Sequence, residues 1–312
     1  MTALQLIRVL ADGNWKSVNV SSTLAAELTG MGLQIEKDAA GRCRLSEPIE
    51  LLQVNRILPQ LRNGDSVSLQ IVDTIPSTNT ALMDSPTPGL ARAQVLAAEY
   101  QQAGRGRQGR SWQSPFAGGL CLSIAWRFDP APQHPGTLSL AVGVGVLRAL
   151  QKLGINDTGL KWPNDLIVDN AKIGGILAEL RNTSSGMDVV AGIGLNLRLD
   201  DQIIERIETD RGLRPGVISP TAELVAAGRN GLAAVLIDEL TDMFRLFQQK
   251  GFATLRQEWN HADVLQGQTI EVSGPVPLSG VADGVDETGA LLLRSDDAIH
   301  QIYSGEVRVR KS

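Results

Sequence analysis

Three apolar runs between residues 160 and 197 constrain the fold more than any other part of the sequence. The runs cover residues 160–168, 172–180 and 189–197, and short polar turns at 169–171 and 184–186 separate them. Apolar runs of this length, bounded by Asn, Asp, Ser and Gly, are typical of strands joined as hairpins. Consecutive hairpins make an antiparallel or mixed sheet, so this region predicts the centre of a sheet.

The neighbouring segments predict further strands and helices for the same domain. Strand patterns occupy residues 68–72, 95–98 and 120–128, and helix patterns occupy residues 78–83, 138–153 and 232–250. We therefore expect an α+β fold in which helices cover one face of a central mixed or antiparallel sheet. This central domain is expected to span residues 64–265.

The N-terminal residues 1–63 resemble an incomplete winged helix. Two short helix patterns, at 3–11 and 22–29, precede a small hairpin pattern at 33–45. A complete helix-turn-helix needs another helix between them, and residues 13–20 are too few and too β-branched to form it. The first 62 residues carry seven basic and six acidic side chains, so this domain has little net attraction for DNA.

The C-terminal residues 266–312 predict a small SH3-like β-barrel. Short strand patterns alternate here with turns rich in Gly, Pro, Ser and Asp. The segment 200–220 before it has little periodicity, and we expect a mobile loop that can act as a lid.

Composition restricts the class of protein. The net charge of -5 and the pI near 5.3 exclude a general attraction for nucleic acid, so any basic site must be local. The sequence has two cysteines without C-x-x-C spacing, no signal-peptide pattern, and no apolar run near the roughly 20 residues of a membrane span. We expect a cytoplasmic protein without a membrane segment. The three histidines are too scattered for a structural zinc site.

The segment 98–112 has the composition of an anion-binding loop. Its arginines at 105, 107 and 110 alternate with glycines at 104, 106 and 109. Glycines permit sharp turns and close backbone approach, and guanidinium groups bind carboxylates and phosphates. The glycines also fit G-x-G-x-x-G, but Pro115 follows too soon for a helix, so we exclude a dinucleotide-binding turn.

Two lysines flank the first predicted hairpin. Lys161 and Lys172 each begin an apolar arm, where a charge is costly without an anionic partner. Pro163 predicts an edge strand or a bulge, which would turn Asn164 and Asp165 toward a ligand or a metal. Each lysine taken alone is more often a surface residue, and Ser77-Thr78-Asn79 alone is more often a helix cap.

Together these segments resemble the motifs of biotin protein ligases. The matching residues are 77–79, 99–112, 161–165, 172–177 and 192–196, in this order and spacing. The resemblance extends from about Asp73 to the end of the chain, and it is strongest to the bacterial subgroup that carries an N-terminal winged helix and acts as biotin operon repressor.

The resemblance implies an ATP-dependent, AMP-forming biotin–[acetyl-CoA-carboxylase] ligase. Such an enzyme converts biotin and ATP into biotinyl-5′-AMP, then transfers biotin to a lysine of the biotin carboxyl carrier protein of acetyl-CoA carboxylase. Its cofactors are ATP and Mg²⁺, the metal being held through the phosphates, and biotin is the substrate.

The resemblance also assigns roles to individual residues. The catalytic residues would be Lys172, Arg105 and Arg107. The biotin-binding residues would be Ser77, Thr78, Asn79, Gln101, Arg105, Gly106, Arg107, Trp112 and Lys172. The ATP or phosphate contacts would be Lys161, Asn164, Asp165 and Asn196.

Two other functions remain alternatives to the ligase. One is a biotin-responsive DNA-binding repressor, but the missing helix leads us to expect ligase activity without reliable repressor function. The other is lipoate–protein ligation on a similar fold. Gln101-Gln102 followed by the Gly-Arg-Gly-Arg loop favours biotin instead, because a lipoyl chain has no ureido group to match it. Family members also pair their sheets edge to edge, which allows a homodimer through an exposed edge strand.

Overall fold

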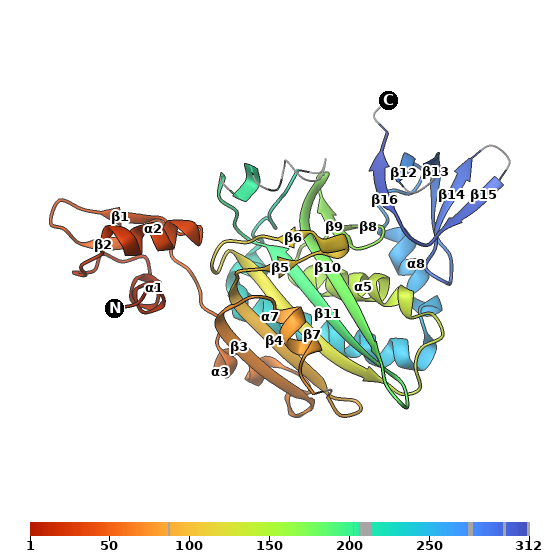
Figure 1. Cartoon of the computed structure of the whole chain (residues 1–312), viewed down its shortest axis with the longest axis horizontal. Helices are drawn as coiled ribbons and strands as arrows, with labels where there is room; N and C mark the ends of the chain where they lie inside the picture. The colour runs from red at the N-terminus through yellow and green to blue at the C-terminus, as the bar shows by residue number, and fades with distance from the viewer. Residues whose placement is uncertain are drawn as a thin grey trace.

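The computed structural model describes residues 1–86, 88–201, 203–205, 207, 214–273, 277–295 and 298–310. It has three parts along its long axis (Figure 1). A small N-terminal unit lies at one end, the main sheet and its helices lie in the middle, and a small β domain lies at the other end. Residues 202, 206 and 208–213 of the predicted lid at 200–220 lie outside the described residues, so the lid stays a prediction.

The central sheet has seven strands in the order β3-β4-β7-β11-β10-β9-β8. β3 and β4 pair in parallel, and the other neighbours pair antiparallel, so the predicted mixed sheet is confirmed. The strands are β3 (Val67–Ile75), β4 (Ala93–Gln101), β7 (Gly119–Phe128), β8 (Gly159–Lys161), β9 (Asp165–Val168), β10 (Ala171–Asn182) and β11 (Met187–Asn196).

One predicted hairpin arm is two strands. The prediction of a single strand over 160–168 is wrong, because the chain turns at Trp162-Pro163 and pairs β8 with β9. Pro163 cannot donate a backbone hydrogen bond, so a strand cannot continue regularly through it. The turn places Lys161 opposite Asp165 in the antiparallel register and makes β8 the edge of the sheet.

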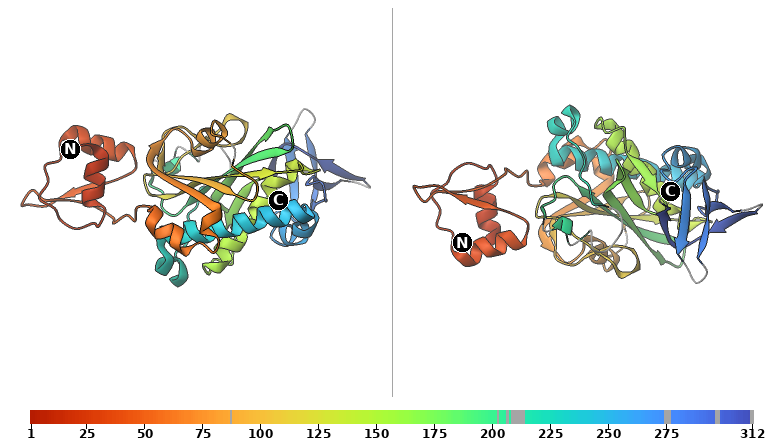
Figure 2. Two further views of the ribbon diagram at one scale, coloured as in Figure 1. Left: turned by 90° about the horizontal axis from the view of Figure 1, so that it is seen from below. Right: turned by 90° about the horizontal axis from the view of Figure 1, so that it is seen from above.

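The expectation that helices cover only one face is also wrong. Helices α5 (Leu138–Lys152), α7 (Ala222–Lys250) and α8 (Ala253–His261) belong to the large core on one face. On the other face, Leu82 of the short helix α4 (Thr78–Met83) packs against Leu96 and Val190. Figure 2 shows α5 and α7 (yellow-green and cyan) and the orange-brown α4 on opposite sides of the sheet.

Aromatic side chains fill the core under α7. Trp126 stacks on Phe244 with 5.7 Å between ring centroids, and Phe128 meets the same ring edge to face. α7 begins ten residues before the predicted start at Leu232, and it is broken at Gly228, whose φ is 64°. A positive φ suits glycine, and the break allows the backbone N–H of Arg229 to bind the carboxylate of Glu50.

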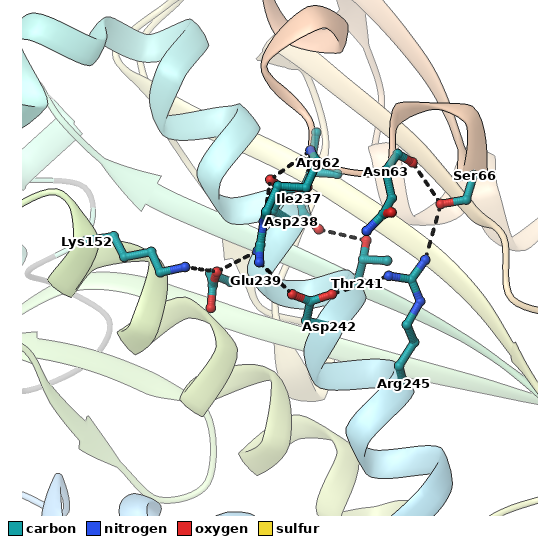
Figure 3. A network of polar contacts seen from close by, with 10 residues as sticks. All are labelled: Arg62, Asn63, Ser66, Lys152, Ile237, Asp238, Glu239, Thr241, Asp242 and Arg245. Carbon is teal, nitrogen blue, oxygen red and sulfur yellow. Dashed lines mark hydrogen bonds and ion pairs between the residues drawn. The ribbon is translucent and has the colours of Figure 1, made fainter.

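A polar network fastens the segment after the N-terminal unit to α7 (Figure 3). Arg62 forms ion pairs with Asp238, Glu239 and Asp242 at 2.9–3.1 Å, and Lys152 of α5 binds Glu239 at 2.5 Å. The network therefore joins residue 62 to two helices of the core. A helix α3 (Val54–Ile57) and a 3-10 turn η1 (Leu58–Gln60) precede it.

The N-terminal unit contains two helices and a hairpin. These are α1 (Ala3–Leu10), α2 (Ser22–Gly30), β1 (Ile35–Lys37) and β2 (Cys43–Leu45). Residues 11–21 between the helices form no helix, as the sequence predicts, and Lys16 instead bridges Cys43. The unit contacts the central domain where Phe116 enters its apolar core and donates its backbone N–H to the carbonyl of Met31 at 2.8 Å.

The C-terminal domain is a five-stranded antiparallel sheet in the order β15-β14-β13-β12-β16, which confirms the predicted small β domain. Its strands are β12 (Thr269–Ser273), β13 (Leu278–Val285), β14 (Leu291–Ser295), β15 (Ala298–Ile302) and β16 (Glu306–Val309). Trp162 donates its Nε1 proton to the carbonyl of Gly289 and so links this domain to the β8–β9 turn. Within the described ranges, no helix is both long and apolar enough to cross a membrane.

Candidate active site

A cavity lies on the face of the sheet opposite α5 and α7. Strands β7, β10 and β11 line it, together with the start of α4, the loop after β4 and the strand β16 of the C-terminal domain. The cavity brings together every predicted site residue except Asn196. The site is therefore built from six separate stretches of the sequence: 77–79, 101–112, 122–123, 161–177, 192–194 and 305–308.

The arginine-rich loop folds as a miniature hairpin over this cavity. Strand β5 (Gly104–Arg105) pairs with β6 (Ser111–Trp112), and Gln108 and Gly109 turn the chain with φ values of 56° and 75°. A Cβ on Gly104 would lie 2.5 Å from the carbonyl oxygen of Trp112, so this close pairing requires glycine. A strand and not a helix follows the glycines, in agreement with the exclusion of a dinucleotide-binding turn.

One end of the cavity is a chain of buried polar side chains. The Oγ atoms of Thr78 and Ser123 lie 2.7 Å apart, and Ser123 donates to Oδ1 of Asn79 at 2.8 Å. The backbone N–H of Thr78 donates to Oε1 of Gln101 at 2.8 Å. Ser77 lines the same end and caps α4 by accepting the backbone N–H of Thr80. Such groups can bind a small polar ligand at several atoms at once.

Sequence reasoning missed Ser123 although a signal was present. It is a fully buried polar residue in the otherwise apolar middle of β7. A polar side chain inside an apolar strand needs a hydrogen-bond partner, and that need marks it as a candidate site residue.

Two glycines of β11 let other side chains lie directly on the sheet. A Cβ on Gly192 would lie 2.5 Å from Oδ1 of Asn79, and a Cβ on Gly194 would lie 2.3 Å from the indole of Trp112. Neither distance is possible for real atoms, so both positions require glycine. Trp112 therefore forms an apolar wall next to the polar chain.

The other end of the cavity is rich in cations. Lys172 forms an ion pair with Asp165, and Lys161 and Arg107 line the same region. Burial lowers the pKa of Lys161, the Asp165 carboxylate opposes this effect, and the charge of Lys172 adds to it. Burial also lowers the pKa of Arg107. Because desolvated cations are costly, this end favours an anionic ligand.

The C-terminal domain closes the cation-rich end. Arg110 of the arginine-rich loop forms an ion pair with Glu306 of β16, and Arg308 of the same strand also lines the cavity. Sequence reasoning missed Glu306 and Arg308, because nothing local indicates which loop the C-terminal domain contacts.

Asn196 stands apart from the other predicted residues. It is buried at the end of β11, and its Nδ2 donates to the carbonyl of Gly216 at 3.1 Å. The cavity lining does not include it, so its contact with ATP stays a prediction that this arrangement does not favour. Its observed contact holds the chain near residue 216 against the sheet.

The cavity does not resemble a protein-built metal centre. In the part of the chain that the structure describes, no three His, Cys, Asp or Glu side chains gather as a metal site. Asp165 lines the cavity beside Asn164, whose Nδ2 donates to the carbonyl of Ile176 at 2.7 Å. A divalent cation here would need further oxygen ligands from the bound substrate.

Comparison with known proteins identifies related chains. The profile of the Biotin/lipoate A/B protein ligase family matches residues 71–196, and that of the Biotin protein ligase C terminal domain matches residues 267–310. The Bifunctional ligase/repressor BirA of Escherichia coli (strain K12) is 34% identical over 99% of this chain and 97% of its own. The Biotin--[acetyl-CoA-carboxylase] ligase of Mycobacterium tuberculosis (strain ATCC 25618 / H37Rv) is 32% identical over 77% of this chain and 88% of its own.

Solved structures have the same fold. The biotin protein ligase from Aquifex aeolicus in complex with biotin and ATP superposes with a TM-score of 0.61 and 24% sequence identity. The match covers 78% of this chain and 99% of that chain. At this identity, the match supports the fold alone.

Proposed function

Because this chain belongs to the biotin protein ligase family, we propose that the cavity activates biotin with ATP and transfers it to a lysine of a carrier protein. The observation that carries the proposal is the division of the cavity into a hydrogen-bonding end and a cation-rich end. Biotin has the same division, with a ureido ring at one end and a carboxylate at the other.

The hydrogen-bonding end takes the ureido ring. Ser77, Thr78, Asn79 and Gln101 bind its polar atoms, and the indole of Trp112 packs against the apolar part of the bicyclic ring. A site of buried donors and acceptors discriminates strongly, because an analogue without the matching groups leaves them unpaired. Ser123 completes this set through its hydrogen bond to Asn79.

The cation-rich end joins the biotin carboxylate to ATP. A carboxylate oxygen attacks the α-phosphorus, the bond from that phosphorus to the pyrophosphate oxygen breaks, and pyrophosphate leaves. Lys172, Arg105 and Arg107 reduce the repulsion between the two anions and stabilise the charge that develops in the transition state. Lys161 is a further phosphate contact, and Gly106 provides a backbone that the ligand can approach closely.

Mg²⁺ fits this end as an ion held chiefly by the phosphates. The chain offers oxygen atoms of Asp165 and Asn164 as additional ligands, which suits the preference of Mg²⁺ for oxygen and for keeping substrate phosphates in its shell. When bound, the metal supplies charge neutralisation on the phosphate oxygens.

In the second step, a neutral lysine amine of the carrier attacks the acyl carbon of biotinyl-5′-AMP. The bond from that carbon to the phosphate oxygen breaks, AMP leaves, and the amine loses a proton as the amide forms. The names of relatives such as the Mycobacterium tuberculosis ligase support the biotin carboxyl carrier protein of acetyl-CoA carboxylase as the carrier.

Biotin-dependent exchange of labelled pyrophosphate into ATP tests the first step without the carrier. We expect exchange with biotin and none with lipoate. Exchange with lipoate alone would support lipoate ligation instead, and exchange with neither would contradict the proposed use of the cavity.

The N-terminal unit lacks features that a repressor needs to bind its operator. Its α2 contains no Lys or Arg, and residues 11–21 supply no additional helix. We expect no specific operator complex in an electrophoretic shift assay with biotin and ATP at low salt. A specific shift there would establish the repressor function.

A cytoplasmic location and a homodimer are the remaining parts of the proposal. Cys43 and Cys121 are buried and form no disulfide with each other, which agrees with a cytoplasmic location. Homodimer formation would use the β3 edge of the central sheet, because the β8 edge already pairs with residues 262–264. Sedimentation with and without biotin and ATP measures it.

A further inference from the structure

Glu179 lies behind the hydrogen-bonding end of the cavity and contacts two of its residues. It belongs to β10, and its carboxylate accepts a hydrogen bond from Nδ2 of Asn79 at 2.8 Å. The same carboxylate forms an ion pair with Arg105 at 2.9 Å. Neither the motifs nor the proposed mechanism gives Glu179 a role.

The carboxylate determines which way the amide of Asn79 points. An ionised carboxylate and a backbone carbonyl can only accept hydrogen bonds. Nδ2 of Asn79 faces both Glu179 and the carbonyl oxygen of Leu177, which lies at 3.2 Å. The amide nitrogen must therefore point toward β10, and Oδ1 must point toward Ser123.

The orientation of the Asn79 amide then fixes the direction of each hydrogen bond along the buried chain. Oδ1 of Asn79 takes the hydroxyl proton of Ser123 at 2.8 Å, so the Ser123 oxygen is left to accept from Thr78 at 2.7 Å. Thr78 has a single hydroxyl proton. Once it is given to Ser123, Oε1 of Gln101 is held by the backbone N–H of Thr78 at 2.8 Å.

We propose that Glu179 is a positioning residue that sets the donor and acceptor direction of the chain Asn79–Ser123–Thr78–Gln101. A urea offers one acceptor oxygen and two N–H donors in fixed places, so a site that binds it must present its own donors and acceptors in one order. A reversed Asn79 amide would reverse the chain: Ser123 would accept from Nδ2 and donate to Thr78, and Thr78 would donate to Oε1 of Gln101, which lies 3.1 Å from its hydroxyl. This inference rests on the proposed biotin function of the cavity.

Glu179 also holds the guanidinium of Arg105 beside α4. Arg105 approaches Oγ1 of Thr80 at 3.3 Å in addition to Glu179. The catalytic arginine thus shares a carboxylate with the residue that orients the ureido site. Glu179→Gln keeps one oxygen that can still accept from Arg105, so its main effect falls on the Asn79 amide.

The test measures biotin affinity by calorimetry and the KM for biotin and for ATP by pyrophosphate exchange. Glu179→Gln keeps the size of the side chain but adds a donor, so the Asn79 amide can reverse. We expect biotin binding to weaken about 10- to 100-fold, the range for losing a hydrogen bond to a charged group, while the KM for ATP changes less than about threefold.

A double variant separates direction from packing. Asn79→Asp alone places two carboxylates together and weakens biotin binding. Asn79→Asp with Glu179→Gln restores a donor facing a carboxylate, and the carboxylate introduced at position 79 still accepts from Ser123, so affinity should return to within about fivefold of the wild type. If the two substitutions caused independent packing defects, the fold losses of biotin affinity in the single variants would multiply in the double variant.

Glu258→Gln is the matched control. Glu258 forms a comparable, half-exposed ion pair with Arg148 on the opposite side of the sheet, and its variant should bind biotin like the wild type. The inference is refuted if Glu179→Gln binds biotin within about twofold of the wild type, or if the double variant is no better than the product of the single ones. Failure of the wild type to bind biotin would refute the proposed function instead.

Discussion

The surroundings of Asp263 predict how much the free energy of unfolding changes with pH. It lies in the turn between α8 and β12, beside the edge strand β8, where the backbone N–H of Val264 binds the carbonyl of Leu160 at 3.0 Å. The residue is only 8% exposed. Its Oδ1 accepts the backbone N–H of Leu265 at 2.9 Å, and its Oδ2 has no hydrogen-bond partner among the described residues.

Burial raises the pKa of Asp263 from 3.8 to about 6. The folded protein therefore holds this proton more tightly than the unfolded chain does. The free energy of unfolding should fall as pH rises from about 4 to about 6, and the loss is complete above that range. A difference of about two pKa units corresponds to about 3 kcal/mol at 1.36 kcal/mol each.

Asp263→Asn removes the charge and keeps an oxygen for Leu265. Near pH 4 the variant should match the wild type, whose carboxyl is then protonated. At pH 8 the variant should be more stable by about 3 kcal/mol, because only the wild type carries a buried charge. Urea unfolding followed by tryptophan fluorescence at both pH values gives the two differences.

The comparison within each pH cancels the titration of all other groups. Asp157→Asn, which changes an exposed carboxyl, serves as the control and should show no pH-dependent difference. If Asp263→Asn and the wild type differ by the same amount at pH 4 and pH 8, the buried carboxyl does not carry the penalty assigned to it.

Four further variants test the site and its support. Lys172→Ala should lower biotin-dependent pyrophosphate exchange about 100-fold or more, through lost stabilisation of the transition state, and normal exchange would remove Lys172 from the mechanism. Arg107→Ala should release the adenylate early and biotinylate lysines of added bystander proteins, whereas unchanged selectivity would contradict its role in retaining the adenylate. Gly194→Ala should displace the indole of Trp112 and weaken biotin binding by about 10-fold or more in calorimetry, the range for overpacking, so wild-type affinity would refute the assigned contact. Phe116→Ala should destabilise the contact with the N-terminal unit by about 3–5 kcal/mol, and limited proteolysis should then cut that unit faster; an unchanged cleavage rate would show that Phe116 does not hold it.

Most of the central sheet was predictable because its signals are local. Apolar runs and Asn, Asp or Gly turns identify β7, β10 and β11 without knowledge of the rest of the chain. The polar triplet at Ser77 and the arginine-rich loop were recognisable for the same reason. The domain boundaries at 63 and 265 stay predictions.

The errors arose where a residue's role depends on distant contacts. Pro163 predicted an irregular strand, but not that β8 and β9 pair with each other around it. The short helix α4 packs on the apolar side chains that β4 and β11 present on the face opposite α5 and α7. The pattern of one strand does not show which helix will cover that face. Glu306 reaches the cavity only because a separate domain docks there.

The two ends of the cavity also differ in what builds them. The hydrogen-bonding end rests on paired strands and α4, so the backbone of the sheet fixes its donors and acceptors in place. The cation-rich end combines a loop, the β8–β9 turn and β16 of another domain, joined by the Arg110–Glu306 ion pair. Recognition of biotin can therefore be rigid before ATP arrives, while the phosphate contacts depend on how the domains meet. A site built in this way can hold one small molecule selectively and still admit ATP and then a carrier lysine at its other end.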